Sequence, residues 1–287
     1  MIRLVVLGDL NLDVCARLSG PMLRDGELRA SVRATPGGSA GNVARAAARD
    51  GAQVVFVGSV GTDAVGDLLI GSLTDLGIEA RVRRVAEPSG IVLSLERDSG
   101  KTMVCSRGAN DGLDESFIDD TLFDGVDHLH VSGYALLSLT QRPVARAAMG
   151  MARRVGLTVS VGLPPANLIH EAGAKWLLEE LTDATLVFLN HAEGAILTGH
   201  ETPPQIVDAL AQRFSTGVLT LGEAGAVAWD GPARDRRSGQ RLAGVDPTGA
   251  GDAFAGGFLT SYLTDRDLAR ANARGEAAAV AFLRSVR

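Results

Sequence analysis

The segment from Asp246 to Leu259 joins a polar turn to a helix-forming run of Ala, Gly and Phe residues. Gly249, Ala250 and Gly251 have almost no side chain, so their backbone N–H groups can come close to a ligand. Such groups at a helix start lack internal partners and lie at the positive end of the helix dipole, which suits a phosphate. Asp252 follows in the first turn and is placed to accept a proton from a hydroxyl group that attacks phosphorus. The alternative role for Asp252 is a helix-capping carboxylate.

A second glycine-rich motif, Gly37–Asn42, precedes an alanine-rich helix. Gly37 and Gly38 would let a sugar-sized ligand lie against the backbone, and the Asn42 amide can donate and accept a hydrogen bond at once. Asp13 is a further candidate, because a carboxylate can accept hydrogen bonds from two neighbouring hydroxyl groups. The alternatives are a glycine loop that caps a helix and a solvated strand residue.

Asn190 and Glu193 follow a short apolar run and would lie on one face of a helical turn. Hard oxygen ligands with incomplete coordination suit Mg²⁺, which keeps several waters and bridges phosphate groups. The alternative is a helix start with Asn190 as the N-cap and Glu193 in a capping position.

Strand-like and helix-like segments alternate along most of the chain, which predicts βαβ units in a mostly parallel sheet with helices on both faces. The expected strands are Arg3–Leu7, Val54–Val57, His128–Val131, Thr158–Val161, Leu186–Leu189, Val218–Thr220 and Ala226–Trp229. The expected helices are Asn42–Asp50, Asp63–Leu76, Arg142–Val155, Glu171–Leu181, Pro203–Phe214, Gly251–Leu263 and Asp267–Phe282. Ligands of such sheets bind beyond the carboxyl ends of the strands.

Two β-rich stretches, residues 12–34 and 80–107, interrupt this alternation. The second contains three expected strands, Arg81–Val85, Ile91–Leu95 and Thr102–Cys105. We interpret both stretches as a small lid sheet folded over one α/β domain that spans residues 1–287.

Four motifs together resemble the signatures of the ribokinase-like carbohydrate kinases, also called the phosphofructokinase B family. Residues 246–252 resemble the C-terminal signature Asp-Thr-x-Gly-Ala-Gly-Asp, with Pro247 in place of the common Thr. Residues 37–42 resemble Gly-Gly-x-x-x-Asn, residues 190–193 match Asn-x-x-Glu, and residues 220–226 resemble the nucleotide loop. The resemblance covers nearly the whole chain and implies a three-layer α/β/α sandwich with a small β lid.

The resemblance implies an ATP-dependent kinase that transfers the γ-phosphate to a hydroxyl group of a small sugar or sugar derivative: 2-keto-3-deoxygluconate, ribose, fructose or a sugar phosphate. Asp252 would be the base, and Gly249, Ala250 and Gly251 the anion hole. The implied substrate residues are Asp13, Gly37, Gly38 and Asn42. The implied nucleotide residues are Asn190, Thr220, Gly222, Gly225 and Asn272, although an exposed polar helix residue is the alternative for Asn272. Glu193 and Asn190 would hold Mg²⁺ through water, and Asp246 with the Thr248 carbonyl would serve a possible monovalent-cation (K⁺) site.

Arg107 bears on the choice of substrate, because a guanidinium group can hold a carboxylate or phosphate through two hydrogen bonds. Such a clamp would favour an acid sugar or a sugar phosphate, whereas the alternative is a solvent-exposed arginine at a strand end. The lid has few aromatic residues, which argues against a nucleoside substrate. A nucleoside kinase and a non-catalytic sugar or nucleotide sensor remain alternatives. Gly162 stands where the family often has Asp, so an acid at that loop has no counterpart here.

The composition excludes several other classes. A formal net charge of -6 and 4% aromatic residues disfavour nucleic-acid binding. No apolar run approaches the roughly 20 residues that span a bilayer, and no targeting segment is recognisable, so we expect a cytoplasmic protein. Cys15 and Cys105 form neither a disulfide framework nor a metal cluster and are expected to be lone buried thiols. Residues 8–13 lack the Gly-x-Gly-x-x-Gly motif of dinucleotide-binding oxidoreductases.

The resemblance to the ribokinase-like family also implies a homodimer formed through the lid.

Overall fold

A nine-stranded sheet forms the centre of the computed structural model, which describes residues 1–20, 25–97, 100–240, 242 and 246–285. The strands lie in the order β13 (Ala233–Arg237), β12 (Ala226–Asp230), β11 (Thr216–Thr220), β10 (Leu186–Asn190), β9 (Thr158–Gly162), β8 (His128–Ser132), β1 (Arg3–Leu7), β4 (Gln53–Gly61) and β5 (Glu79–Val85). All neighbours from β11 to β5 are parallel, and the pairings of β12 with β11 and β13 are antiparallel. The predicted mostly parallel sheet is therefore confirmed.

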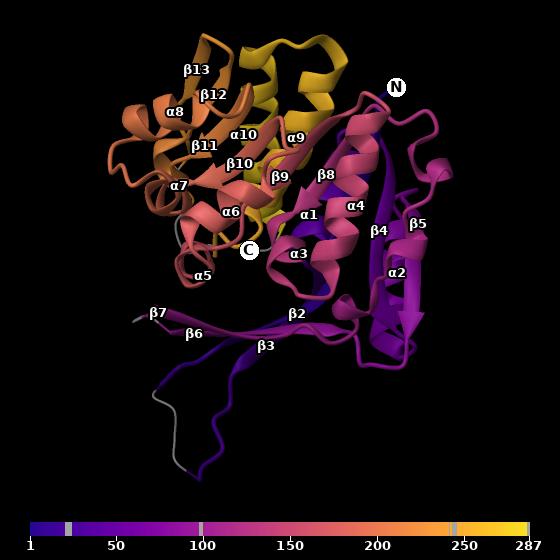
Figure 1. Cartoon of the computed structure of the whole chain (residues 1–287). Coiled ribbons are helices and arrows are strands. Elements are labelled where there is room, and N and C mark those ends of the chain that lie inside the picture. Colours follow the sequence, from indigo (N-terminus) through magenta and orange to yellow (C-terminus); the bar gives the residue numbers. More distant parts are fainter. Residues whose placement is uncertain (21–24, 98–99, 241, 243–245, 286–287) are drawn as a thin grey trace.

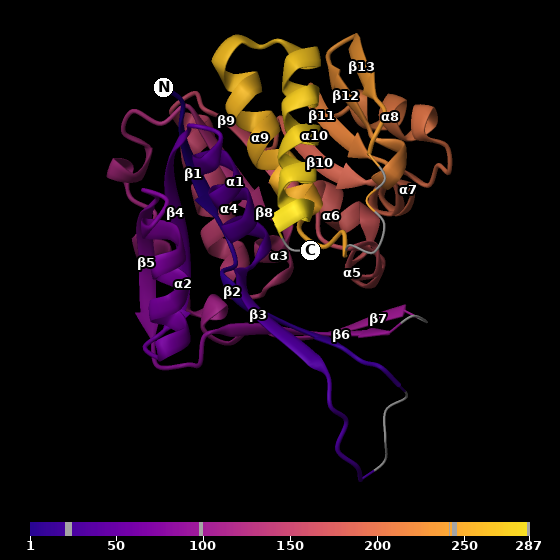
Figure 2. The same ribbon diagram turned by 180° about the vertical axis from the view of Figure 1, so that it is seen from behind.

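Helices cover both faces of this sheet (Figure 1, Figure 2). Along β1, Leu4 and Val6 pack with one group of helices while Val5 and Leu7 pack with the other, as in a strand that is buried on both sides. The first group comprises α1 (Ser39–Arg49), α2 (Ala64–Thr74), α9 (Ala250–Asp265) and α10 (Leu268–Ser285). The second comprises α3 (Gly133–Leu137), α4 (Gln141–Arg154), α5 (Ala166–Ala172), α6 (Ala174–Glu180), α7 (His191–Thr198) and α8 (Pro203–Ala211). No helix within the described ranges combines the length and apolarity needed to cross a membrane.

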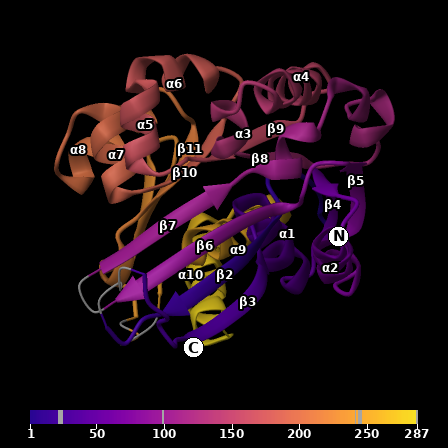
Figure 3. The ribbon, with the colours of Figure 1, turned by 90° about the horizontal axis from the view of Figure 1, so that it is seen from below.

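The lid is a separate four-stranded sheet with the order β3 (Ser31–Gly37), β2 (Asn11–Arg17), β6 (Gly90–Arg97) and β7 (Gly100–Ser106). It extends across the edge of the main sheet where β1, β8, β10 and β11 end (Figure 3). The sheet predicted over the main domain is therefore confirmed, and it places strand ends and lid residues around a shared space.

The register of the lid strands separates their side chains into two faces, because neighbours in register point the same way and successive residues alternate. Asp13 is in register with Val92, and Val92 with Cys105; we call this the inner face. Val14 is in register with Leu93, and Leu93 with Val104; we call this the outer face. The outer face is largely apolar. Both cysteines are free thiols, but Cys15 is only half-buried and Cys105 is exposed, so the prediction of buried thiols was wrong.

Three expectations about the elements need correction. Residues 81–85 were expected in the lid but form β5 at the edge of the main sheet, where Ala80 and Val82 pack beside α2. The expected helix Glu171–Leu181 is two helices, because Gly173 at φ 92° separates α5 from α6. Strand β13 was not predicted, since its sequence Ala-Arg-Asp-Arg-Arg carries no apolar alternation.

Candidate functional site

Helix α9 begins directly after Gly249, whose φ of 86° lies in the left-handed region. A Cβ atom there would lie 2.7 Å from Cζ of Phe282 and 3.1 Å from Nδ2 of Asn42, so this position requires glycine. A Cβ atom at Gly251 would meet no described atom within 4 Å. The start of α9 is therefore open beside Gly251, although the N–H of Ala250 donates to the Pro247 carbonyl oxygen at 3.0 Å. Unpaired N–H groups in the first turn of a helix attract an anion.

Asp252, in the first turn of α9, is held by two side chains from α1. Ser39 Oγ donates a hydrogen bond of 2.9 Å to Oδ1, and Asn42 Nδ2 donates one of 3.2 Å to Oδ2. Burial raises the pKa of Asp252 to about 6, against the opposing effects of these two hydrogen bonds. The carboxylate is therefore mostly ionised at neutral pH and is still basic enough to accept a proton.

Arg45 is a buried cation in this site that the sequence reasoning missed. Its Nη2 donates to Oδ1 of Asn42 at 2.8 Å and to the carbonyl oxygen of Gly37 at 3.1 Å. These bonds orient the Asn42 amide so that Nδ2 faces Asp252, and the charge of Arg45 lowers the pKa values of Asp13 and Asp252. The available signal was its spacing, since Arg45 lies three residues after Asn42 on one helix face.

Asp13 reaches the same space from the lid strand β2. A Cβ atom at Gly37 would lie only 2.0 Å from its Oδ2, so the carboxylate occupies the room that the glycine leaves. Burial raises the pKa of Asp13 to about 6, and the charge of Asp252 contributes in the same direction. Gly38, at φ 84°, packs against the end of β1, where a Cβ atom would lie 2.5 Å from the carbonyl oxygen of Asp9. The two glycine-rich motifs and Asp13 are thus brought together.

Arg107 is engaged in a network at the edge of this space. It donates to both carboxylate oxygens of Asp9, at 2.9 and 3.2 Å, to Asp111 at 2.8 Å and to Gln141 at 2.8 Å. Burial raises the pKa of Asp9 even with this partner. In this arrangement the guanidinium group joins the end of β1 to residues 107–111, and the anion clamp stays a prediction.

Asn190 and Glu193 form a capping box at the start of α7. Glu193 accepts from the Asn190 backbone N–H at 2.8 Å and from Nδ2 at 2.6 Å, while Asn190 Oδ1 accepts from the Glu193 N–H at 3.0 Å. Burial raises the pKa of Glu193 to about 8, with a further contribution from the charge of Asp252. A nearby cation would restore the ionised form, so this oxygen-rich pair fits Mg²⁺. Among the described residues, no group of three or more His, Cys, Asp or Glu side chains is arranged to hold a metal ion, so we expect Mg²⁺ here to be held largely by water and phosphate oxygens.

The loop after β11 folds into a tight turn that begins at Thr220. Gly222 and Gly225 have φ values of 58° and 95°, and Leu221 donates its N–H to the Gly225 carbonyl oxygen at 2.7 Å. Asn272 of α10 was given an exposed alternative, but it is fully buried. Its Nδ2 donates to Asp235 Oδ2 at 2.7 Å, and its Oδ1 has no hydrogen-bond partner among the described residues.

Asp246 lies in the loop before α9 and contacts a lid residue that the sequence reasoning also missed. Lys101 of β7 places Nζ 2.6 Å from Asp246 Oδ2 and 2.6 Å from Thr248 Oγ1. Asp246, the predicted cation ligand, is therefore paired with an ammonium group from the lid.

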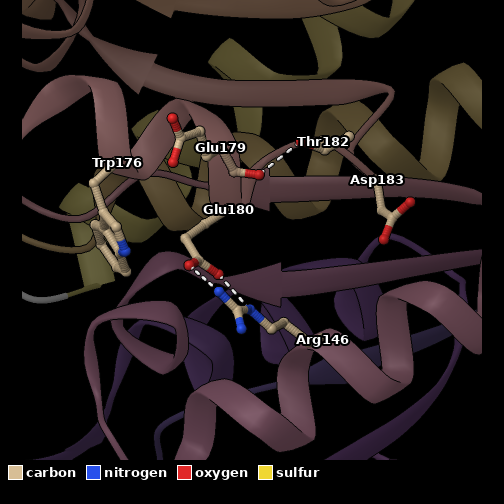
Figure 4. Close-up of a pocket in the computed structure, with 6 residues that line it drawn as sticks. All are labelled: Arg146, Trp176, Glu179, Glu180, Thr182 and Asp183. Atoms are coloured by element: carbon tan, nitrogen blue, oxygen red, sulfur yellow. Dashed lines mark hydrogen bonds and ion pairs between the residues drawn. The ribbon is translucent and has the colours of Figure 1, made fainter.

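A separate hollow of about 360 Å³ lies between α4 and α6, away from these residues (Figure 4). Its lining residues are Arg146, Trp176, Glu179, Glu180, Thr182 and Asp183. Arg146 and Glu180 pair across it, with Nε donating to Oε2 at 2.7 Å. The hollow contains no residue of the four motifs, so we do not assign the chemistry to it.

Comparison with known proteins agrees with this arrangement. Residues 1–286 match the family described as pfkB family carbohydrate kinase. The ATP-dependent ribose-1-phosphate kinase of Halopiger xanaduensis is 31% identical over 278 residues, which cover 94% of this chain and 88% of the relative. The ribokinase of Haemophilus influenzae is 28% identical over 255 residues, which cover 85% of this chain and 79% of the relative. The crystal structure of adenosine kinase from Sinorhizobium meliloti superposes with a TM-score of 0.88 at 23% identity, covering 98% of this chain and 93% of that one. The chain belongs to the pfkB family of ATP-dependent carbohydrate kinases, the ribokinase-like fold.

Proposed function

We propose that this kinase transfers the γ-phosphate of ATP to a hydroxyl group of a small sugar or sugar derivative, with Asp252 as the catalytic base. One observation carries the proposal: the Asp252 carboxylate is held by Ser39 and Asn42 at the open start of α9. A base and an anion site at one helix start are what an in-line attack of a hydroxyl group on phosphorus requires.

In this proposal, different residues of the chain bind the acceptor, accept its proton and stabilise the transferred phosphoryl group. Asp13 and Asn42 bind hydroxyl groups of the acceptor, and Gly37 and Gly38 let it lie against the backbone. Asp252 accepts the proton of the attacking hydroxyl group. The N–H groups of Gly249 and Gly251, at the start of α9, stabilise the negative charge of the phosphoryl group in transit. Mg²⁺, when bound with ATP near Asn190 and Glu193, neutralises phosphate charge.

The proposed nucleotide site is the turn after β11 together with Asn272. Gly222, at φ 58°, has no described atom within 4 Å of a Cβ position and so leaves room for a ligand beside the backbone, while Gly225 closes the turn against the Arg237 carbonyl oxygen. The buried Oδ1 of Asn272 is an unused acceptor among the described residues. These features support nucleotide binding near the end of β11.

For the acceptor we propose a sugar or sugar derivative: ribose, fructose, 2-keto-3-deoxygluconate or a sugar phosphate. The names of two relatives, a ribose-1-phosphate kinase and a ribokinase, favour a pentose. An anion clamp by Arg107 would require it to exchange its bonds to Asp9 and Asp111 for the substrate.

A nucleoside kinase is the second candidate, and Tyr134 favours it. Tyr134 is half-buried in the first turn of α3, which begins directly after β8. Such a ring can stack on a nucleobase.

We further propose that two chains associate through the outer face of the lid. Val32, Val104 and Ile91 are 61%, 57% and 36% exposed there, and a second copy of the same apolar face would cover them.

The experiment is ADP release from Mg–ATP with a panel of acceptors: ribose, ribose 1-phosphate, fructose, 2-keto-3-deoxygluconate, fructose 6-phosphate, adenosine and cytidine. We expect acceptor-dependent turnover with a sugar, and its collapse in Asp252→Asn. Turnover with nucleosides alone would favour the second candidate. Binding of a sugar and ATP without turnover on the panel would favour a sensor, and full activity in Asp252→Asn would exclude Asp252 as the base.

A further inference from the structure

Lys101 stands out in both sequence and structure. Of the 28 basic residues, 26 are arginines, and only Lys101 and Lys175 are lysines. Lys101 is on β7, four residues before Cys105, and therefore on the inner face of the lid with Asp13. Its ammonium group contacts the loop that leads into α9, and its side chain is 24% exposed.

The two carboxylate oxygens of Asp246 accept hydrogen bonds from different partners. Oδ1 accepts from the Thr248 N–H at 3.1 Å and from Thr248 Oγ1 at 2.9 Å, which closes the turn before Gly249. Oδ2 accepts from Lys101 Nζ at 2.6 Å, and the same Nζ lies 2.6 Å from Thr248 Oγ1. The lid ammonium group is therefore the cation that pairs with Oδ2 of this carboxylate.

We propose that Lys101 is a positioning residue whose ammonium group acts as a tethered monovalent cation at Asp246, so that the loop before α9 is held in shape without potassium. An ammonium group is a compact single charge that oxygen atoms can surround, whereas the planar guanidinium group of Arg is not. A free K⁺ ion at Asp246 Oδ2 would be repelled by the ammonium group already there. This inference rests on the proposed phosphoryl transfer and concerns how its anion site is held.

The tether has a mechanical consequence. Lys101 belongs to the lid and Asp246 to the main domain, so the pair exists only while the lid covers the site. Closing the lid would then complete the loop that binds the phosphoryl group, and opening it would leave the Asp246 carboxylate without its cation. A free ion would not couple these two events.

The first test compares turnover in K⁺, in NH₄⁺ and in tetramethylammonium at equal ionic strength, with Mg–ATP and the best acceptor. We expect the wild type to be equally active in all three, within twofold. Lys101→Met should lose about tenfold or more in kcat in tetramethylammonium with little change in the acceptor KM, and K⁺ or NH₄⁺ should restore at least fivefold. Lys175→Met is the matched control, because it removes the other lysine, on α6, and should behave as the wild type.

The second test needs no turnover and uses the melting temperature in the same salts. Lys101→Met should melt at a higher temperature in K⁺ than in tetramethylammonium, and the wild type and Lys175→Met should not. Stimulation of the wild type by K⁺, or a Lys101→Met variant that lacks both the kcat loss and the K⁺-dependent melting shift, would overturn the proposal. If the wild type turns over no acceptor, the proposed function fails, and the melting shift alone decides the role of Lys101.

Discussion

The ionisation of Asp252 sets the acid side of the pH profile that we expect for this enzyme. Burial beside α1 raises its pKa to about 6 from an ordinary value of 3.8. A base must be unprotonated to work, so kcat/KM should fall as the pH drops through this value, since kcat/KM reports the free enzyme.

The size of the fall follows from the pKa. With a pKa of about 6, the ionised fraction is about 91% at pH 7 and about 9% at pH 5, so kcat/KM falls about tenfold. With an ordinary pKa the ionised fraction would stay above about 90% at both values, and the rate would hardly change. Asp13, whose pKa is also raised to about 6, adds a second proton, so the fall can reach about a hundredfold.

The assay is ADP release at low acceptor concentration between pH 5 and 8, for the wild type and for Asp252→Asn. We expect the variant to lose about 10²- to 10⁴-fold at pH 7 and to keep only the weaker pH dependence that Asp13 contributes. Asp75→Asn, which changes an exposed carboxylate after α2, is the control and should follow the wild type. A wild-type profile that is flat from pH 5 to 7 would refute the raised pKa, and an active Asp252→Asn would refute the base.

Four further changes test other parts of the site and the lid. Gly249→Ala forces a side chain into the left-handed region and toward Phe282, so we expect a loss of about 1–3 kcal/mol in unfolding free energy, measured by urea denaturation, together with lost activity. Arg45→Met leaves the acceptors of Arg45 unpaired and should lower the free energy of unfolding by about 3 kcal/mol. Because the charge of Arg45 lowers the pKa of Asp252, the same variant should shift the acid limb of the pH profile to higher pH, and an unshifted limb would contradict this charge effect. Glu193→Gln should weaken the Mg²⁺ dependence of turnover about tenfold without lowering the melting temperature, and an unchanged Mg²⁺ titration would remove Glu193 from the metal site. Val104→Glu on the outer face of the lid should convert a dimer to a monomer in light scattering, and an unaltered mass would place any association elsewhere.

The strands of the main sheet could be predicted because their burial on both faces leaves continuous apolar runs, as in residues 4–7 and 186–189. The edge strands lack this signal. Strand β13 is almost entirely charged, and β5 mixes Arg and Val in a way that suits a lid as well as an edge. Their positions depend on pairing with β12 and β4, which the sequence does not display.

The motif residues around Asp252 could be predicted because parallel strands and their helices end at one edge of a sheet. Lys101 could not, since its partners Asp246 and Thr248 lie 145 and 147 residues away and only folding brings them within hydrogen-bond distance. Asn272 shows the same limit. It was given an exposed alternative, yet it is buried because its partner Asp235 lies on the unpredicted strand β13.

Successive side chains of the lid strands point to opposite faces, so the lid residues form two sets that protein engineering can vary separately. Side chains at Cys15, Val92, Met103 and Cys105 share the inner face with Asp13, whereas Val14, Leu93 and Val104 share the outer one. A combinatorial library restricted to the first set would therefore vary the lid face that carries Asp13 and leave the opposite face chemically unchanged. Selection for new acceptors could proceed on every second residue of the lid, independently of whatever assembly the remaining residues support.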